Sequence, residues 1–514
     1  MIKKKLPIGV QDFRVLREEN SLYVDKTELI HKIITEGYYY LFIRPRRFGK
    51  SLLLSTLKEI FQGSKELFEG LWIENNWDWT KRNPVVHISF AAAGFREMGL
   101  TKAIESIIDF QARFHRVFLK SEGIANRFKE LLEILNEKHG KVVVLIDEYD
   151  KPIVDYIDNV EQANINKEIL RDFYVVLKDS PQYLRFVFIT GISKFSKVSI
   201  FSALNHLKDI SMADSMATLV GYTQEELENS FEAYMPSAMK RNDFSRQELL
   251  DALRKWYNGY SWDGINRVYN PFSILNFFSE GDFKNFWFST GTPTFLSVLA
   301  RKQNFYDLDN VETELTSFET FDIEDLDPEA VMFQTGYLTV KKIDRQRQRY
   351  TLSYPNREVR KAFLVYMLEA YTFVPVSRIP PTAIKLENAL FCKDIPTVIE
   401  LVNTMFANIP SQIFDGTSEK YFHSLMHLLL NYLGTNIESE INTNKGRIDS
   451  VVQTPQYLYI LEFKFDKTAD DALKSIHERG YLEKYGHFEQ ELIAIGINFS
   501  SKLKGIDDWK MENL

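Results

Sequence analysis

The sequence predicts an α/β protein with a helical middle module, and three observations support this fold class. In roughly the first 220 residues, apolar strand-like runs alternate with amphipathic helical stretches. From about Thr223 the pattern is mainly helical, and from Ser411 it follows the order helix, three strands, helix, strand. Continuous Val/Ile/Leu strands separated by helices indicate a parallel sheet covered on both faces. We therefore expect domains at 1–222, 223–410 and 411–514.

Length and composition restrict the class of protein further. A chain of 514 residues is too long for one core, and 45% hydrophobic with 26% charged residues is ordinary globular composition. The single cysteine, Cys392, excludes a disulfide framework and fits a reducing compartment. No run of about 18 apolar residues and no apolar stretch behind the basic start is present, so we expect a cytoplasmic protein without a membrane span. The net charge of −8 does not indicate a nucleic-acid binder, but local basic patches decide that property.

The expected elements follow in order along the chain. The first domain has four buried strands, at 38–43, 84–90, 141–147 and 184–190. In the middle module, "TQEELENSF" from Thr223 is a helix-capping sequence, and residues 337–354 are typical of two strands joined by a polar turn. A helix is expected from Asn356 and a second helical stretch at about 380–408. A helical bundle with a hairpin is compatible with a winged-helix-like module.

A phosphate-binding loop is predicted at "RPRRFGKS", from Arg44 to Ser51, between a strand and a Leu-rich helix. Gly49 permits close approach of the backbone to a phosphate, Lys50 can reach the β- and γ-phosphates, and the Ser51 hydroxyl can bind Mg²⁺. Arg44 stands where the pattern has its first glycine, which weakens the match, although Pro45 can restrict the turn instead. The alternative is a basic helix start without a ligand. The residues expected to contact the nucleotide are Arg46, Arg47, Phe48, Gly49, Lys50, Ser51, Leu52 and Thr190.

The strand "VVVLIDE" favours the nucleotide hypothesis because it has the usual form of the second nucleotide motif. Asp147 is expected to hold Mg²⁺, directly or through water, and Glu148 to polarise the attacking water as a catalytic residue. The alternative is that these acidic residues only end a buried strand. Thr190, at the end of the next strand, is either a sensor of the γ-phosphate or an ordinary strand cap. Lys194 and Lys197 are either charge-neutralising residues or solvated lysines, and we interpret them as solvated. We assign no arginine finger.

Several stretches together resemble one known family. These are "SLYVDKTELI", "FIRPRRFGKSLLL", "VLIDEYDKPI", "TGISKFSKVSIFSALNHLKDIS", "WYNGYSW" and "VYNPFSIL", which are similar to the AAA-ATPase-like family of bacterial proteins. In that family the Arg-Pro-Arg-Arg-Phe-Gly-Lys-Ser form of the loop is usual, so the missing glycine is implied to be a family trait. The resemblance covers nearly the whole chain, because such proteins carry a C-terminal domain of the PD-(D/E)XK nuclease superfamily. It therefore implies a P-loop NTPase domain with ATP as cofactor.

The C-terminal part contains a second candidate site. Asp449 lies in "GRIDSVV", and Glu462 and Lys464 lie in "YILEFKF", where a spacing of two places both side chains on one face of a strand. If the two strands pair through "TPQ", Asp449 can lie beside Glu462, and two carboxylates there can hold Mg²⁺. The alternative is a hairpin with solvent-facing charges. The order of elements resembles the PD-(D/E)XK nuclease core, which implies Asp449 and Glu462 as metal ligands and Lys464 as the catalytic lysine.

Three further positions bear on this nuclease-like site. The resemblance implies that Glu419 or Glu440 completes it. His423 and His427 are four residues apart on a helix but lie among apolar neighbours, so we interpret them as packing residues. Relatives often carry a Gln in the second core helix where this chain has Ser475, and that difference removes a polar contact without touching the metal ligands.

The leading hypothesis is an ATP-binding and ATP-hydrolysing protein whose C-terminal domain cleaves DNA with Mg²⁺. The second hypothesis is a nucleotide-switched signalling or scaffold protein whose nuclease-like domain binds DNA or a partner without cleaving. A third is that both sites are structural. The sequence leaves open whether the protein forms a homo-oligomer, which nucleic acid it acts on, and whether it serves defence against foreign DNA or mobile-element biology.

Overall fold

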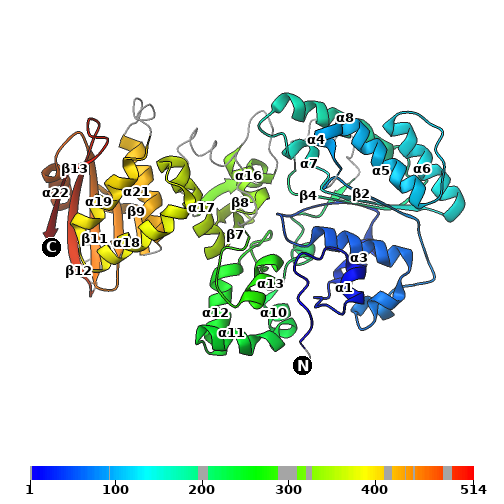
Figure 1. Ribbon diagram of the computed structural model, residues 1–514, viewed down its shortest axis with the longest axis horizontal. Coiled ribbons are helices and arrows are strands. Elements are labelled where there is room, and N and C mark those ends of the chain that lie inside the picture. Colours follow the sequence, from blue (N-terminus) through cyan, green and yellow to red (C-terminus); the bar gives the residue numbers. More distant parts are fainter. Residues whose placement is uncertain are drawn as a thin grey trace. The chain divides into compact units, whose positions relative to one another are not determined.

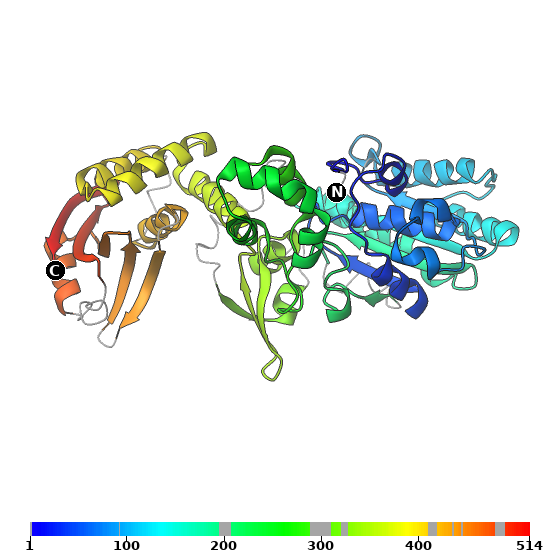
Figure 2. The same cartoon turned by 90° about the horizontal axis from the view of Figure 1, so that it is seen from below.

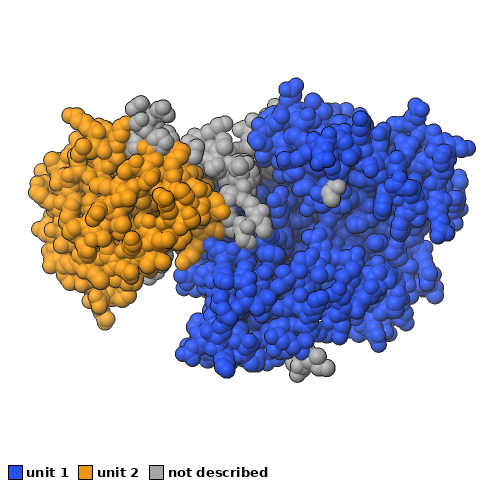
Figure 3. Space-filling view, viewed as in Figure 1, with its two compact units in different colours: residues 1–289, 308–359 blue, residues 290–307, 360–514 orange. Residues whose placement is uncertain are grey.

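The structure is a computed structural model, and the chain forms two compact units within it. Unit 1 contains Met1–Ser289 and Leu308–Val359, and unit 2 contains Thr290–Asp307 and Arg360–Leu514 (Figure 3). The described residues are 3–91, 93–194, 207–287, 310–319, 327–409, 419–433, 436–443, 446–478 and 489–514, with the backbone alone at 419–420, 436–443 and 446–448. The helical middle contributes residues to both units. The boundaries expected at 222 and 410 stay a prediction from sequence pattern.

Unit 1 begins with a five-stranded parallel sheet in the order β2-β3-β4-β1-β5. The strands are β1 Tyr39–Ile43, β2 Val85–Ser89, β3 Val142–Asp147, β4 Leu184–Gly191 and β5 Lys208–Asp209. The four predicted strands are confirmed, and the two-residue β5 is an addition that the sequence pattern did not indicate. All side chains of the interior strand β3 are buried because helices cover both faces of the sheet.

The helices of this part lie on the two faces of the sheet (Figure 1). On one face lie α1 Phe13–Glu18, α2 Thr27–Glu36 and α3 Lys50–Gln62; on the other lie α4 Phe95–Met98, α5 Leu100–Phe114, α6 Ile124–His139, α7 Lys151–Val154 and α8 Val160–Lys178. Helix α3 contacts β2 and β3, and α5 and α6 contact the same two strands from the opposite side. The two nucleotide motifs therefore end at one edge of the sheet, because the strands are parallel.

The helical module of unit 1 follows the sheet. Its helices are α10 Gln224–Ser230, α11 Met235–Asn242, α12 Arg246–Tyr257 and α13 Pro271–Glu280, and α15 Leu315–Glu319 and α16 Pro328–Thr335 come later. The predicted helix start at Thr223 is confirmed: its side chain accepts from the Glu226 backbone N–H, and the Glu226 carboxylate accepts from the Thr223 N–H. The core of this module includes Leu22 and Val24, which come from the N-terminal segment.

The predicted hairpin at 337–354 is also confirmed. Strands β7 Thr339–Asp344 and β8 Arg349–Ser353 pair antiparallel, and β6 Val311–Glu314 adds a third strand beside β8. The winged-helix-like character of the module stays a prediction. Single turns of 3-10 helix lie at Lys65–Phe68, Trp72–Asn75, Asp214–Met216, Glu232–Tyr234 and Val376–Arg378.

Unit 2 contains a mixed sheet in the order β13-β12-β11-β10-β9. Its elements are α17 Arg357–Thr372, α18 Ile379–Phe391, α19 Ile395–Phe406, α21 Glu419–Leu433, β9 Asn436–Thr443, β10 Gly446–Gln453, β11 Tyr457–Phe465, α22 Ala469–Glu478, β12 Glu491–Ser500 and β13 Gly505–Asn513. Figure 2 shows the yellow helices α18 and α19 alongside this sheet. The predicted order from α21 to β12 is confirmed, with β11 and β12 parallel across α22, and β13 is an unpredicted edge strand.

Among the described residues, no single helix is long and apolar enough to cross a membrane. One pair of helices, Arg357–Thr372 and Val376–Phe391, passes the length and composition test only when the two are joined across a bend of 112°.

Candidate nucleotide site and nuclease-like site

The loop from Arg44 to Gly49 joins β1 to the first turn of α3. Gly49 precedes the helix with a φ of 87°, and a Cβ added there would meet nothing within 4 Å. The requirement for glycine is therefore its left-handed backbone and not a lack of space. Arg47 also has a positive φ, of 68°. The loop thus leads into a helix N-terminus whose first N–H groups lack intrahelical partners, which is an arrangement suited to an anion.

Lys50 lies at this helix start and folds back over the loop. Its ammonium donates to the backbone oxygens of Arg44 and Pro45, both at 2.9 Å. Burial lowers the pKa of Lys50, while the charges of Asp147, Asp150 and Glu148 raise it. The loop carbonyls hold the ammonium where phosphate oxygens can replace them as acceptors.

A cavity of about 450 Å³ lies over the loop, entirely within unit 1. Seven of the eight residues predicted to bind the nucleotide line it, namely Arg46, Arg47, Phe48, Gly49, Lys50, Ser51 and Leu52. Glu148 lines it as well, so the predicted water-polarising residue and the phosphate loop face one space. The remaining walls come from four separate segments, represented by Pro7, Tyr23, Val220 and Phe272.

Asp147 and Thr190 lie together at the ends of the adjacent strands β3 and β4. The Thr190 hydroxyl donates to Asp147 Oδ1 at 2.8 Å, and both side chains are buried. Neither residue lines the cavity. Thr190 therefore holds the predicted metal ligand in place, and its role as a sensor of the γ-phosphate stays a prediction.

Glu148 has a left-handed backbone, with a φ of 53°, and its carboxylate lies 3.9 Å from the Lys151 ammonium. Burial raises its pKa, and Lys151 opposes that shift. A raised pKa brings a carboxyl group closer to the range in which it can accept a proton from water. The position and the environment of Glu148 both suit a general base.

Arg44 explains the missing first glycine of the loop. Its guanidinium, 1% exposed, lies between the rings of Phe42 and Trp262, at 4.4 and 3.7 Å from their centroids. It donates to the backbone oxygens of Ile43 at 2.8 Å and Ser211 at 2.7 Å. Burial lowers the pKa of Arg44 to about 9. The side chain ties the start of the loop to residues 211–262 and does not line the cavity.

Arg46 and Arg47 differ in what they contact. Arg47 donates to the backbone oxygens of Phe286 at 2.8 Å and Trp287 at 3.1 Å, and its guanidinium lies 3.8 Å from the ring centroid of Phe272. Arg46 is exposed, lines the cavity, and has no hydrogen bond or ion pair within the described part of the chain. Arg47 therefore joins the loop to the helical module, and Arg46 is available for an anionic ligand.

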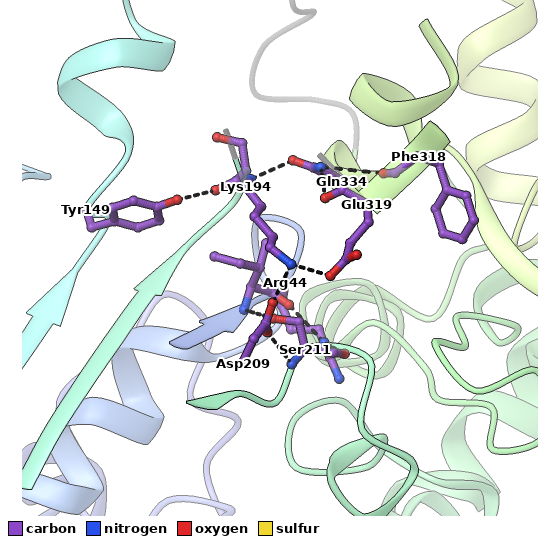
Figure 4. Close-up of polar contacts among 10 residues, drawn as sticks. Arg44, Tyr149, Lys194, Asp209, Ser211, Phe318, Glu319 and Gln334 are labelled. Atoms are coloured by element: carbon purple, nitrogen blue, oxygen red, sulfur yellow. Dashed lines mark hydrogen bonds and ion pairs between the residues drawn. The ribbon is translucent and has the colours of Figure 1, made fainter. Parts of the chain in front are cut away.

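The prediction that Lys194 is solvated is wrong. Its ammonium forms ion pairs with Glu319 and, at 2.7 Å, with Asp209 (Figure 4). Its backbone N–H donates to Gln334 Oε1 at 2.7 Å. Burial lowers the pKa of Lys194, but the two carboxylates outweigh that effect and raise it. The partners come from β5, α15 and α16, which the order of residues in the chain does not reveal; Lys197 lies outside the described residues.

In unit 2 the structure brings the three predicted nuclease residues together. Ser450 pairs with Leu461 across β10 and β11, so the register places Asp449 opposite Glu462 and on the same face of the sheet. Asp449 Oδ2 accepts from the Phe463 N–H at 2.7 Å, and the Lys464 ammonium lies 2.8 Å from Glu462 Oε1. Glu462 is buried and Lys464 is partly exposed.

The other residues considered around this site are either outside the described side chains or make local contacts. The side chains of Glu419 and Glu440 lie outside the described residues, and within those residues no three His, Cys, Asp or Glu side chains form a metal cluster. His423 packs edge-on against Phe463, and His427 Nε2 lies 2.7 Å from the Asn431 amide, as expected of packing residues. The Ser475 hydroxyl donates to the Asp471 backbone oxygen within α22, so it makes a local helix bond.

The cavity walls were missed because no local pattern marks them. Some of these wall residues do lie in stretches that resemble the family, but the resemblance gave those stretches no role. "SLYVDKTELI" contains Tyr23, and "VYNPFSIL" contains Pro271 and Phe272. Asp150, in "VLIDEYDKPI", is a further case. Its Oδ2 accepts from the Ile192 and Ser193 backbone N–H groups, at 3.0 and 2.7 Å, and thereby holds the end of β4 beside β3.

Comparison with known proteins places the two parts of the chain in two families. The family described as "Predicted AAA-ATPase" matches residues 7–201, and the PD-(D/E)XK nuclease superfamily matches residues 417–509. A protein of Azotobacter chroococcum mcd 1, described as an uncharacterized protein in the vnfD 5′ region, is 36% identical over 527 residues and is matched along the whole of both chains. The chain belongs to the AAA-ATPase-like family, with a C-terminal domain of the PD-(D/E)XK nuclease superfamily.

One solved structure shows a weaker similarity. The Aeropyrum pernix ORC1 protein in complex with DNA matches with a TM-score of 0.22 and 10% identity, over 66% of this chain and 91% of that chain. A similarity of this size carries no argument about function.

Proposed function

We propose that unit 1 binds and hydrolyses ATP and that unit 2 cleaves DNA phosphodiester bonds with a divalent cation. The observation that carries the proposal is that the predicted catalytic groups converge at two places. Lys50, Ser51 and Glu148 line one cavity, and Glu462 lies between Asp449 and Lys464 on one sheet face. The membership of both domains in nucleotide and nuclease families supports this assignment.

The charges and the apolar walls of the cavity favour one orientation of the nucleotide. Its phosphates belong at the N-terminus of α3, where the free N–H groups, Lys50 and Arg46 supply positive charge. The base then lies toward the apolar walls, such as Leu22, Val220 and Phe272. Ser51 and Asp147 would hold Mg²⁺, which supplies charge neutralisation at the phosphates, and Glu148 would orient and deprotonate the attacking water.

The chemistry of the second site follows from its charges. Asp449 and Glu462 offer the carboxylate oxygens that hard divalent cations prefer, and such a cation supplies charge stabilisation and an activated water when bound. Lys464 lies 2.8 Å from Glu462, which holds its ammonium beside that carboxylate. From there it can orient the water and stabilise negative charge that develops on the phosphate.

The test is cleavage of supercoiled plasmid by the full-length protein with Mg²⁺ or Mn²⁺, with and without ATP. Lys464→Ala and Asp449→Asn should each slow nicking by about 100-fold, because each removes a group that acts on the scissile phosphate or its cation. Lys467→Ala is the matched control, because Lys467 is exposed and close in the chain. Equal nicking by Lys464→Ala and the parent protein would refute the nuclease assignment.

The second candidate is a nucleotide-switched protein whose unit 2 binds nucleic acid without cutting it. It is favoured by one observation: Arg44, Arg47 and Lys194 each connect the nucleotide domain to the helical module. Turnover of ATP without cleavage of single- or double-stranded DNA or RNA would support this candidate over the nuclease.

A further inference from the structure

A surface outside both sites combines exposed aromatic rings with unpaired cations. It runs through "FQARFHRVFLK", residues 110–120, from the last turns of α5 into the connection to α6. We name it the Phe–Arg surface, and its members are Phe110, Arg113, Phe114, Arg116, Phe118 and Lys120. None of them lines the cavity over the phosphate loop.

The exposure of the three phenylalanines is unusual. Phe110, Phe114 and Phe118 are 57, 56 and 79% exposed. Phe110 and Phe114 lie one helical turn apart and so share a face, whereas apolar residues on the opposite face of α5, such as Ile104 and Ile108, are buried. Adjacent exposed rings of this kind are typical of an interaction site.

The cations of this surface have no acidic partners. Arg113, Arg116 and Lys120 are exposed and form no ion pair within the described part of the chain, and residues 110–120 contain no Asp or Glu. Two acidic groups close to this stretch are already engaged. Asp109 pairs with Arg127, and the Glu130 carboxylate accepts from the Lys120 and Ser121 backbone N–H groups.

Arg116 adds an observation about the backbone. It follows the C-cap of α5 with a φ of 55°, a conformation that favours glycine or asparagine over arginine. In the sequence, Arg116 lies between Phe114 and Phe118. Because arginine is disfavoured in this backbone conformation, its presence at position 116 suits a function of its charge.

This chemistry fits one class of ligand better than others. Exposed aromatic rings stack with unpaired bases, and arginines between them neutralise backbone phosphates, which is how single strands are bound without sequence preference. A two-fold contact between copies of this chain would place the same surface of both copies face to face, so that their unpaired cations would repel each other. We propose that the Phe–Arg surface binds single-stranded nucleic acid. The inference goes beyond the proposed function, because it concerns a binding site on unit 1 that neither reaction requires.

The experiment measures fluorescence anisotropy of a labelled thirty-nucleotide dT strand with full-length protein in EDTA, so that no metal-dependent cleavage occurs. One variant is Phe110→Ala/Phe114→Ala/Phe118→Ala. The other is Arg113→Ala/Arg116→Asn, in which asparagine tolerates the positive φ. The matched controls are Tyr38→Ala/Ile265→Ala and Lys240→Ala/Lys255→Ala, which change exposed apolar and exposed basic residues elsewhere in unit 1.

Each surface variant should bind the strand about tenfold more weakly than the parent, because stacking and phosphate contacts each contribute to affinity. In the arginine variant, the slope of log K against log salt should become shallower by about 1.4, since each phosphate contact with a single strand contributes about 0.7. The controls should bind as the parent does.

Three results would overturn the proposal. They are absence of strand binding by the parent, equal losses in the surface and control variants, and unchanged strand binding in the surface variants. If the surface variants bind the strand as the parent does, and light scattering shows that they have lost an oligomeric state of the parent, the surface is instead an interface between copies. Plasmid nicking by the same variants is measured separately, so a failure here is distinguishable from a failure of the proposed nuclease.

Discussion

Individual residues of the phosphate loop divide into those that face the cavity and those that hold the loop from behind. Lys50 and Arg46 belong to the first group and Arg44 to the second, and Arg47 does both, because it lines the cavity and also donates to Phe286. A glycine at position 44 would match the general loop pattern but would leave the rings of Phe42 and Trp262 without the guanidinium between them. The departure from the pattern is therefore a structural contact and not a defect in the site.

Arg44→Gly should destabilise the protein although it restores the general pattern. The change leaves the buried backbone oxygen of Ser211 without this donor and opens a cavity beside Trp262, which should cost about 3 kcal/mol. Urea unfolding followed by tryptophan fluorescence measures the difference. Arg46→Gly in the same loop is the control, and equal midpoints for all three proteins would contradict the role assigned to Arg44.

At the scale of elements, Glu358 joins separate segments of unit 1. Glu358 lies at the start of α17. Its carboxylate accepts from the Ser273 hydroxyl of α13 and from the Trp287 backbone N–H, both at 2.8 Å. Burial raises its pKa to about 7, although these hydrogen bonds oppose the shift. Arg47, from the phosphate loop, lowers that pKa through its charge, so this junction lies close to the nucleotide loop.

The sign of the resulting pH dependence is determined by the raised pKa. Because the folded protein binds this proton more tightly than the unfolded chain, the stability from Glu358 is fully present below about pH 4.5 and is lost as the pH rises through about 7. The expected loss is about 3 kcal/mol. Urea unfolding between pH 5 and 8 should show that Glu358→Gln depends less on pH than the parent. Parallel pH profiles for the two proteins would contradict this.

At the scale of the whole molecule, the proposed function requires two reactions in one chain. Arg44, Arg47 and Lys194 connect the nucleotide domain to the helical module, whose sequence continues into unit 2. A coupling between the sites would appear as an effect of ATP on cleavage.

Lys50→Ala should separate the two reactions. It removes the buried cation that lines the cavity, so ATP affinity in calorimetry should fall by about 100-fold, and plasmid nicking should no longer respond to ATP. Nicking without ATP should be unchanged, because Lys50 lies in unit 1 and the cleaving residues in unit 2. Lys65→Ala, at an exposed position after α3, is the control. An identical response of parent and Lys50→Ala to ATP would argue against coupling.

Much of the fold and part of each site followed from local pattern. The buried strands at β1 and β3 and the glycine of the loop are encoded in runs of a few residues, because periodicity and backbone freedom are local properties. That Asp449 comes close to Glu462 was also predictable, because a short connection between the two strands favours a hairpin.

The sequence by itself determined which residues could carry phosphate and metal chemistry, namely Lys50 and Ser51, Asp147 and Glu148, and Asp449, Glu462 and Lys464. Only the tertiary structure decided the roles of Arg44, Arg47 and Lys194 and the walls of the cavity. Arg44 meets Trp262, and Lys194 meets Glu319, across more than a hundred residues of chain. Such contacts depend on how helices pack against the sheet, and no pattern within a short stretch of sequence contains that information.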